Sequence, residues 1–132
     1  MTVRRVNPAH LAPPIGFSHA VVAEGSTIVF LAGQTALNAE GVIVGATMLE
    51  QFEQAFGNLL AALAEAGGEP ANLAKLTIFC TDPAAYRAQA REIGAAWKRM
   101  AGRDYPAMAL IGISRLWDDE AMIELEGIAV LP

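Results

Sequence analysis

The chain has 132 residues, 54% of them hydrophobic and 17% charged, and it carries a net charge of −5. This length predicts a single domain over residues 1–132 that can form a core without disulfides. The acidic balance argues against a nucleic-acid partner, because phosphates require a basic protein surface. The single cysteine excludes an intramolecular disulfide and fits a reducing compartment. Since neither a signal-peptide core nor an apolar run of ~18 residues is found, we expect a cytoplasmic protein without a membrane span.

The N-terminal part of the chain is rich in β-forming residues. A short edge strand is predicted within residues 2–7, followed by a proline-containing segment without regular structure. Two further strands are predicted over residues 17–24 and 27–34, where β-branched and aromatic residues are concentrated. Gly25 and Ser26 lie between these strands and predict a tight hairpin.

A first helix is predicted after Thr47. Thr47 and Glu50 have the spacing of a capping box, in which each side chain binds the backbone amide of the other residue. Gly67 and Gly68 predict the end of this helix. Apolar residues recur between these limits at three- and four-residue steps and predict one buried face: Leu49, Phe52, Phe56, Leu59, Leu60 and Leu63.

A fourth strand and a second helix follow. Residues 75–82 are dense in β-branched and aromatic side chains, and Asp82 and Pro83 then form a typical helix start. Gly102 predicts the end of this helix. Its apolar stripe consists of Tyr86, Ala90, Ile93, Trp97 and Met100.

Two final strands are predicted over residues 106–115 and 121–130, which gives the order β-β-β-α-β-α-β-β. Each helix is apolar on one side only, so we expect both to cover one face of a mixed sheet in a two-layer α+β domain. The runs TIVFLAG and AMALIGI are apolar at both parities, which is typical of strands buried on both faces. We therefore expect other subunits to cover the second face.

The few polar residues in the strands each have a structural and a functional interpretation. Gly33 either bends its strand or lets backbone amides face a ligand. Glu124 and Glu126 point to one face of the last strand, where a solvent-exposed edge, a salt bridge or a general acid or base would explain them.

The remaining candidate residues have simpler interpretations. Arg91 of the second helix is expected to be a surface or interface charge, and Cys80 a small buried side chain. The two histidines form no cluster of ligand spacing, so no metal site is expected.

Five segments follow one another along the chain: PPIGFSHAV, VFLAGQTALNAEG, NLLAALAEAGG, KLTIFCTD and YPAMALI…IELEGIAV. Their order and spacing, from about residue 8 to residue 131, resemble the RidA/YjgF family of reactive-intermediate deaminases. The resemblance implies a chorismate-mutase-like fold and a homotrimer with a cleft at each subunit interface. It also implies hydrolysis of reactive enamines and imines to ketones and ammonia without a cofactor.

The resemblance further implies roles for individual residues. Gly33 matches the strand-end glycine whose backbone assists the reaction, and Glu124 matches the carboxylate that positions the water. The family arginine that binds the substrate carboxylate is absent, because its Pro-Ala-Arg pattern reads Pro106-Ala107-Met108 in this chain. Methionine offers no hydrogen-bond donor, so efficient hydrolysis of small 2-imino acids is not expected.

Other positions of the implied substrate pocket also depart from the family pattern. Phe17 stands in place of a tyrosine, Leu110 in place of a frequent cysteine, and Ala90 in place of a cleft asparagine. With Ala107 and Met108, these side chains predict a more apolar pocket. Arg91 follows the lost asparagine and would supply a replacement charge if it reached the substrate from another direction.

Two functions remain open at this stage. The first is a cofactor-independent deaminase for a different enamine, imine or related amine-derived intermediate, because Gly33 and Glu124 persist. The second is a non-catalytic trimer that binds a small molecule or regulates a partner, since the arginine, the tyrosine hydroxyl and the cysteine are all lost. An older family label concerns RNA cleavage, and the net charge of −5 ranks that function third.

Overall fold

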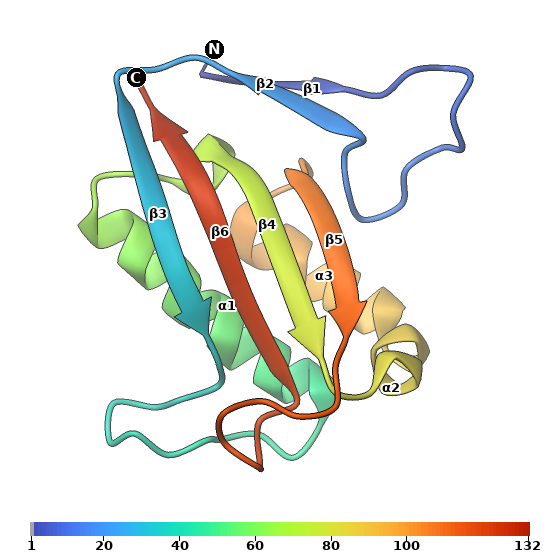
Figure 1. Cartoon of the computed structure of the whole chain (residues 1–132), viewed down its shortest axis with the longest axis vertical. Helices are drawn as coiled ribbons and strands as arrows, with labels where there is room; N and C mark the ends of the chain where they lie inside the picture. Colours follow the sequence, from blue (N-terminus) through green and yellow to red (C-terminus); the bar gives the residue numbers. More distant parts are fainter. Residues whose placement is uncertain (1) are drawn as a thin grey trace.

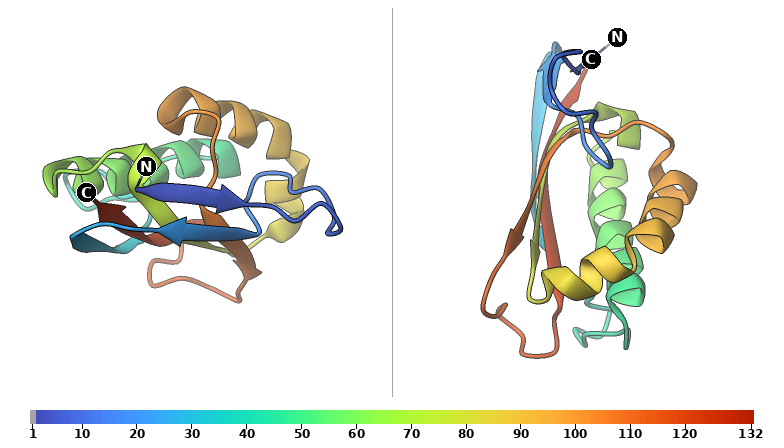
Figure 2. Two further views of the ribbon diagram at one scale, coloured as in Figure 1. Left: turned by 90° about the horizontal axis from the view of Figure 1, so that it is seen from above. Right: turned by 90° about the vertical axis from the view of Figure 1, so that its right-hand side faces the viewer.

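Helices cover one face of a four-stranded sheet in the computed structural model, which describes residues 2–132 (Figures 1 and 2). The strands lie in the order β3 (Thr27–Gln34), β6 (Ile123–Leu131), β4 (Leu73–Cys80) and β5 (Ala107–Gly112). β4 and β5 are parallel, and the other neighbours are antiparallel. The predicted two-layer α+β fold with a mixed sheet is therefore confirmed.

The longest helix, α1 (Met48–Glu65), begins and ends where the sequence predicts. The amide of Glu50 donates to Thr47 Oγ1 over 3.1 Å, and the amide of Thr47 donates to Glu50 Oε1 over 3.2 Å. The helix ends before Gly67, whose φ of +91° favours glycine. The predicted apolar face packs on the sheet, and its most buried members are Phe52, Phe56, Leu59 and Leu63. A short 3₁₀ turn, Pro70–Asn72, then leads into β4.

The second predicted helix is divided at Gln89 into α2 (Pro83–Ala88) and α3 (Ala90–Ala101). Asp82 caps α2 as predicted, because its Oδ1 accepts a hydrogen bond from the amide of Ala85 over 3.1 Å. Gln89 leaves the helical conformation at φ −106° and ψ 16°, and its side chain accepts a hydrogen bond from the amide of Leu49 in α1. This contact between helices depends on the tertiary structure and has no signal in the local sequence.

The predicted hairpin at Gly25 and Ser26 is wrong. β2 (Ala20–Ala23) pairs with β1 (Val3–Val6) in a separate two-stranded sheet, whereas β3 pairs with β6 (Figure 1). Gly25 is required for a different reason, since a Cβ atom there would lie 2.1 Å from the carbonyl oxygen of Leu131. The turn thus crosses the end of β6 and carries the chain from one sheet to the other.

The helix-free face of the sheet is apolar and exposed. Ile28 and Phe30 on β3 and Ile111 on β5 retain 59%, 76% and 42% of their surface. Exposed side chains of this size on one continuous face are typical of a surface that another protein chain covers. Glu124 and Glu126 lie on the same face, because they alternate with the buried β6 residues.

Gln51 of α1 connects the helix layer to the start of β6. Its side chain is 1% exposed, donates to the carbonyls of Gly45 and Glu120, and accepts from the amide of Met122. Replacing Gln51 with leucine leaves these backbone groups without this partner, so we expect about 2–4 kcal/mol of stability to be lost. Urea unfolding measures this change, and a loss below about 1 kcal/mol would contradict the structural role.

Candidate functional site

A partly open cavity of about 280 Å³ lies between the helix layer, the edge strand β5 and the N-terminal segment around Phe17. The helix wall is formed by one face of α3, where Ala90, Ile93, Gly94 and Trp97 follow helical spacing. Met108 and Leu110 form the wall on β5. Three of the predicted substrate-binding residues, Phe17, Met108 and Leu110, therefore lie around one cavity.

Aromatic stacking makes part of the cavity wall rigid. The ring of Tyr105 stacks on Trp97 at a centroid distance of 4.8 Å, and Trp97 stacks on the buried Phe56 at 4.4 Å. The indole Nε1 of Trp97 also donates to the carbonyl of Asp104 over 3.1 Å. These contacts hold Tyr105 at the cavity in one orientation.

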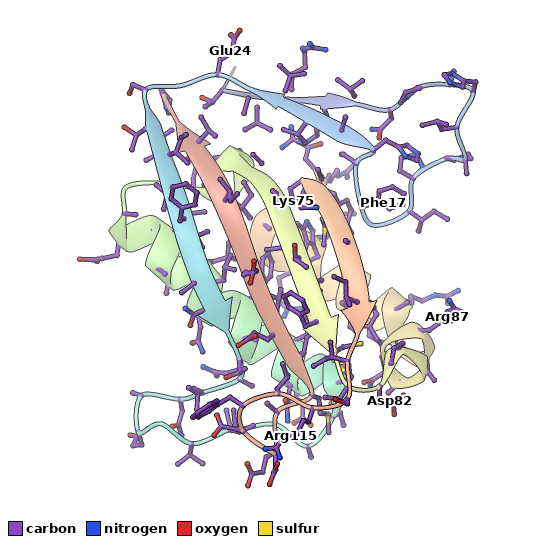
Figure 3. The ribbon with its side chains drawn as sticks, viewed as in Figure 1. Phe17, Glu24, Lys75, Asp82, Arg87 and Arg115 are labelled. Atoms are coloured by element: carbon purple, nitrogen blue, oxygen red, sulfur yellow. The ribbon has the colours of Figure 1, made fainter. Side chains whose placement is uncertain are left out.

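The N-terminal segment is fixed to the beginning of β5. The amide of Ser18 donates to the carbonyl of Pro106 over 3.0 Å, and the Ser18 hydroxyl donates to the carbonyl of Tyr105 over 2.7 Å. These bonds explain why β2 begins later than the predicted residue 17. They also place Phe17 next to the start of β5 (Figure 3). The ring of Phe17 makes an edge contact with His19 at a centroid distance of 5.0 Å.

Gly33 and Glu124 lie in direct proximity, although 91 positions separate them in the sequence (124 − 33). The register between β3 and β6 shifts between Leu31 and Gln34, which places Gly33 in a bulge. A Cβ atom at Gly33 would lie 2.9 Å from Cδ of Glu124. The absence of a side chain at Gly33 therefore leaves the space that the Glu124 carboxylate occupies.

The cavity and the Gly33–Glu124 pair lie on opposite faces of the sheet within one chain. Met108 pairs with Leu76, which is fully buried beneath the helices. Glu124 pairs with Phe79, three residues further along β4, so its side chain has the opposite parity. A single chain therefore does not bring the predicted catalytic and substrate-binding residues together.

The remaining predicted residues lie outside the cavity wall. Arg91 is an exposed residue of α3 and is not among the residues that line the cavity. Ala107 is half-buried and forms a β-bridge with Ser18. Cys80 is fully buried, as predicted, and burial raises the pKa of its thiol.

Sequence reasoning missed two tyrosines at the cavity. Tyr86 belongs to the predicted apolar stripe of the second helix and Tyr105 has no predicted role, but both line the cavity. Burial raises the pKa of Tyr86 to about 12 and that of Tyr105 in the same direction. Both phenols are therefore protonated near neutral pH. A tyrosine inside an apolar helix stripe was the available signal, because its hydroxyl needs a polar environment.

Residues 2–132 were also compared with the requirements of a metal site and of a membrane-spanning helix. No group of three or more His, Cys, Asp or Glu side chains in this part of the chain is arranged to hold a metal ion. In the same range, no helix combines the length and apolar character needed to cross a bilayer.

The sheet order, the covering helices and the edge cavity define a chorismate-mutase-like α+β protein. A family model described as Endoribonuclease L-PSP matches residues 8–131. The chain therefore belongs to this family, which includes the Rid and YjgF proteins.

Individual relatives agree along nearly the whole chain. A RutC family protein of Synechocystis is 32% identical, covering 100% of this chain and 99% of the relative. A 2-iminobutanoate/2-iminopropanoate deaminase of Dermatophagoides farinae is 29% identical, with 99% of both chains covered. The crystal structure of YyfB, a Rid family protein of unknown function from Yersinia pestis, is 37% identical, with a TM-score of 0.88 and coverage of 99% of this chain and 100% of YyfB.

Proposed function

We propose that this protein is a cofactor-independent deaminase that hydrolyses a reactive enamine, imine or related amine-derived intermediate. The observation that carries the proposal is the close approach of Glu124 to Gly33, which presents a carboxylate beside an open backbone position. Membership of a family that includes an iminobutanoate deaminase supports the same reaction class. The family description also names endoribonucleases, but a net charge of −5 disfavours RNA as a substrate.

The active site is proposed to form between subunits of a homotrimer. In one chain the cavity and Glu124 lie on opposite sides of the sheet, so a neighbouring copy must bring its Gly33 and Glu124 to the cavity. The exposed apolar residues of the helix-free face, including Phe30, supply the surface for this association. The trimer is therefore proposed as a requirement for activity.

In the proposed reaction, Glu124 accepts a proton from water as the water oxygen forms a bond to the imine carbon. The C=N π bond breaks, and the nitrogen takes up the proton that Glu124 removed from water, which gives a tetrahedral amino alcohol. Glu124 then transfers the hydroxyl proton to the nitrogen as the C–N bond breaks and the carbonyl forms, and ammonia leaves. Backbone groups near Gly33 would stabilise polar atoms of the substrate during this addition.

Ammonia release tests the proposed activity. We expect the protein to accelerate ammonia release from benzaldimine, an uncharged aryl imine, above the rate in buffer, and to have little effect on 2-iminopropanoate. The reason is that Met108 offers no donor to the carboxylate of the second compound. No acceleration with either compound would contradict the proposal.

The alternative function is a trimer that binds a small molecule without turnover. It is favoured by one observation: among the described residues, no charged side chain lines the cavity. A compound that stabilises the trimer and is recovered unchanged, together with no ammonia release from either imine, would support this second function.

Gly33→Ala tests the arrangement of the proposed catalytic pair. The added methyl group would lie 2.9 Å from Glu124 Cδ, so the flexible carboxylate must move aside. We expect ammonia release to fall by about tenfold or more, because small displacements of catalytic groups are costly. Thermal unfolding should change little, since Gly33 is exposed. Unchanged activity would mean that the observed position of Glu124 is not required.

A further inference from the structure

We propose that the cavity binds a neutral, ring-sized substrate through the hydroxyl groups of Tyr86 and Tyr105, in place of a carboxylate–arginine contact. This assignment rests on the proposed deaminase function of the same site. It names the substrate class that the family relationship leaves open.

The uncharged lining of the cavity disfavours anionic substrates. Its described lining residues carry no charge, and Met108 stands where the family resemblance implies an arginine. A carboxylate that entered would lose part of its hydration and gain no cationic partner, which is unfavourable. The same apolar surface favours a neutral ligand, because the ligand loses little hydration when it binds.

The two phenols are available as hydrogen-bond donors. Tyr86 and Tyr105 are half-buried and line the cavity. Within residues 2–132, neither hydroxyl hydrogen-bonds to protein, and neither is among the fully buried polar atoms that lack a partner. Both hydroxyls therefore retain accessible surface. Their raised pKa values keep them protonated, so each can donate to a carbonyl oxygen or an imine nitrogen.

The size and the walls of the cavity fit a single ring. A dry protein cavity of about 150 Å³ can hold benzene, and this cavity measures about 280 Å³. Tyr105 is already part of a stack with Trp97 and Phe56, so a ligand ring can pack on a wall that needs no rearrangement. Met108 can adapt to the outline of such a ring.

Calorimetric titration with benzamide and benzoate tests this inference, because the two probes have nearly the same shape and differ in charge. We expect benzamide to bind at least tenfold more tightly than benzoate. Tyr86→Phe and Tyr105→Phe should each weaken benzamide binding by about three- to tenfold, since each loses one hydrogen bond to a neutral group. Met108→Arg should reverse the preference between the probes.

The control is Trp117→Phe, a conservative aromatic change at a residue that is 92% exposed and outside the cavity. It should leave benzamide binding unchanged, and circular dichroism should show that all variants are folded. Benzoate binding as tight as that of benzamide, no binding of benzamide, or full binding by both tyrosine variants would overturn the inference. Binding is measured without turnover, so a failed ammonia assay with retained discrimination would remove the deaminase function and leave the ligand class intact.

Discussion

Replacing Glu124 with glutamine will reduce ammonia release by about 10²–10⁴-fold, the range expected when a general base is lost. Glutamine has nearly the same size and keeps a carbonyl oxygen beside Gly33, but it does not accept a proton from water. Glu124 is half-buried and makes no hydrogen bond or salt bridge to another described residue, so the fold should tolerate the change. The measurement is steady-state ammonia release from benzaldimine, with the assembly state checked by analytical ultracentrifugation.

Glu126→Gln is the matched control for this prediction. Glu126 is on the same strand and the same face, two positions after Glu124, but it is exposed and pairs with Thr77 of β4. We expect the control to keep activity within about threefold of the unmodified protein. Full activity of Glu124→Gln would remove Glu124 from the reaction. An equal loss in both variants would indicate a general electrostatic effect of this face.

Replacing Met108 with arginine will create activity toward 2-iminopropanoate. A charge-assisted contact to a carboxylate contributes roughly 1.5–3 kcal/mol, which corresponds to a roughly ten- to hundredfold gain. The arginine would extend from β5 into the cavity, because Met108 already lines it. The measurement is the rate of ammonia release from 2-iminopropanoate for the variant and the unmodified protein.

Met108→Gln separates charge from polarity in this experiment. Glutamine is a neutral donor and acceptor of similar length, so it should produce much less of the gain. Absence of activity toward 2-iminopropanoate in Met108→Arg, with Glu124 intact, would contradict the proposed deaminase function and favour ligand binding. If Met108→Gln matches the arginine variant, the missing charge is not what restricts the substrate.

Local sequence signals were sufficient for most of the secondary structure. The capping box of Thr47 and Glu50 and the apolar periodicity of α1 depend on neighbours within a few residues, and the structure contains both. The hairpin prediction at Gly25 failed because the glycine is required by a carbonyl at the other end of the chain, Leu131. A sequence pattern within a few residues of Gly25 cannot predict this contact with Leu131.

The candidate site could likewise be predicted only in part from the sequence. The sequence pointed to Gly33 and Glu124 through the family resemblance, and the structure places them together because β3 and β6 are neighbours with a shifted register. Tyr86 was counted as core, since helical periodicity assigns a residue to a face and does not report whether a cavity lies beside it. The roles of these residues and the cytoplasmic location stay predictions.

The sequence by itself determined the family and the fold class, because these depend on residue identity and order. The absence of the substrate arginine at Met108 stays a prediction from the family resemblance. Only the tertiary structure decided which side chains meet. It separated Met108 and Glu124 onto opposite faces of one sheet and brought two tyrosines to the cavity. The physical reason is that strand pairing and parity set side-chain positions across residues far apart in the chain.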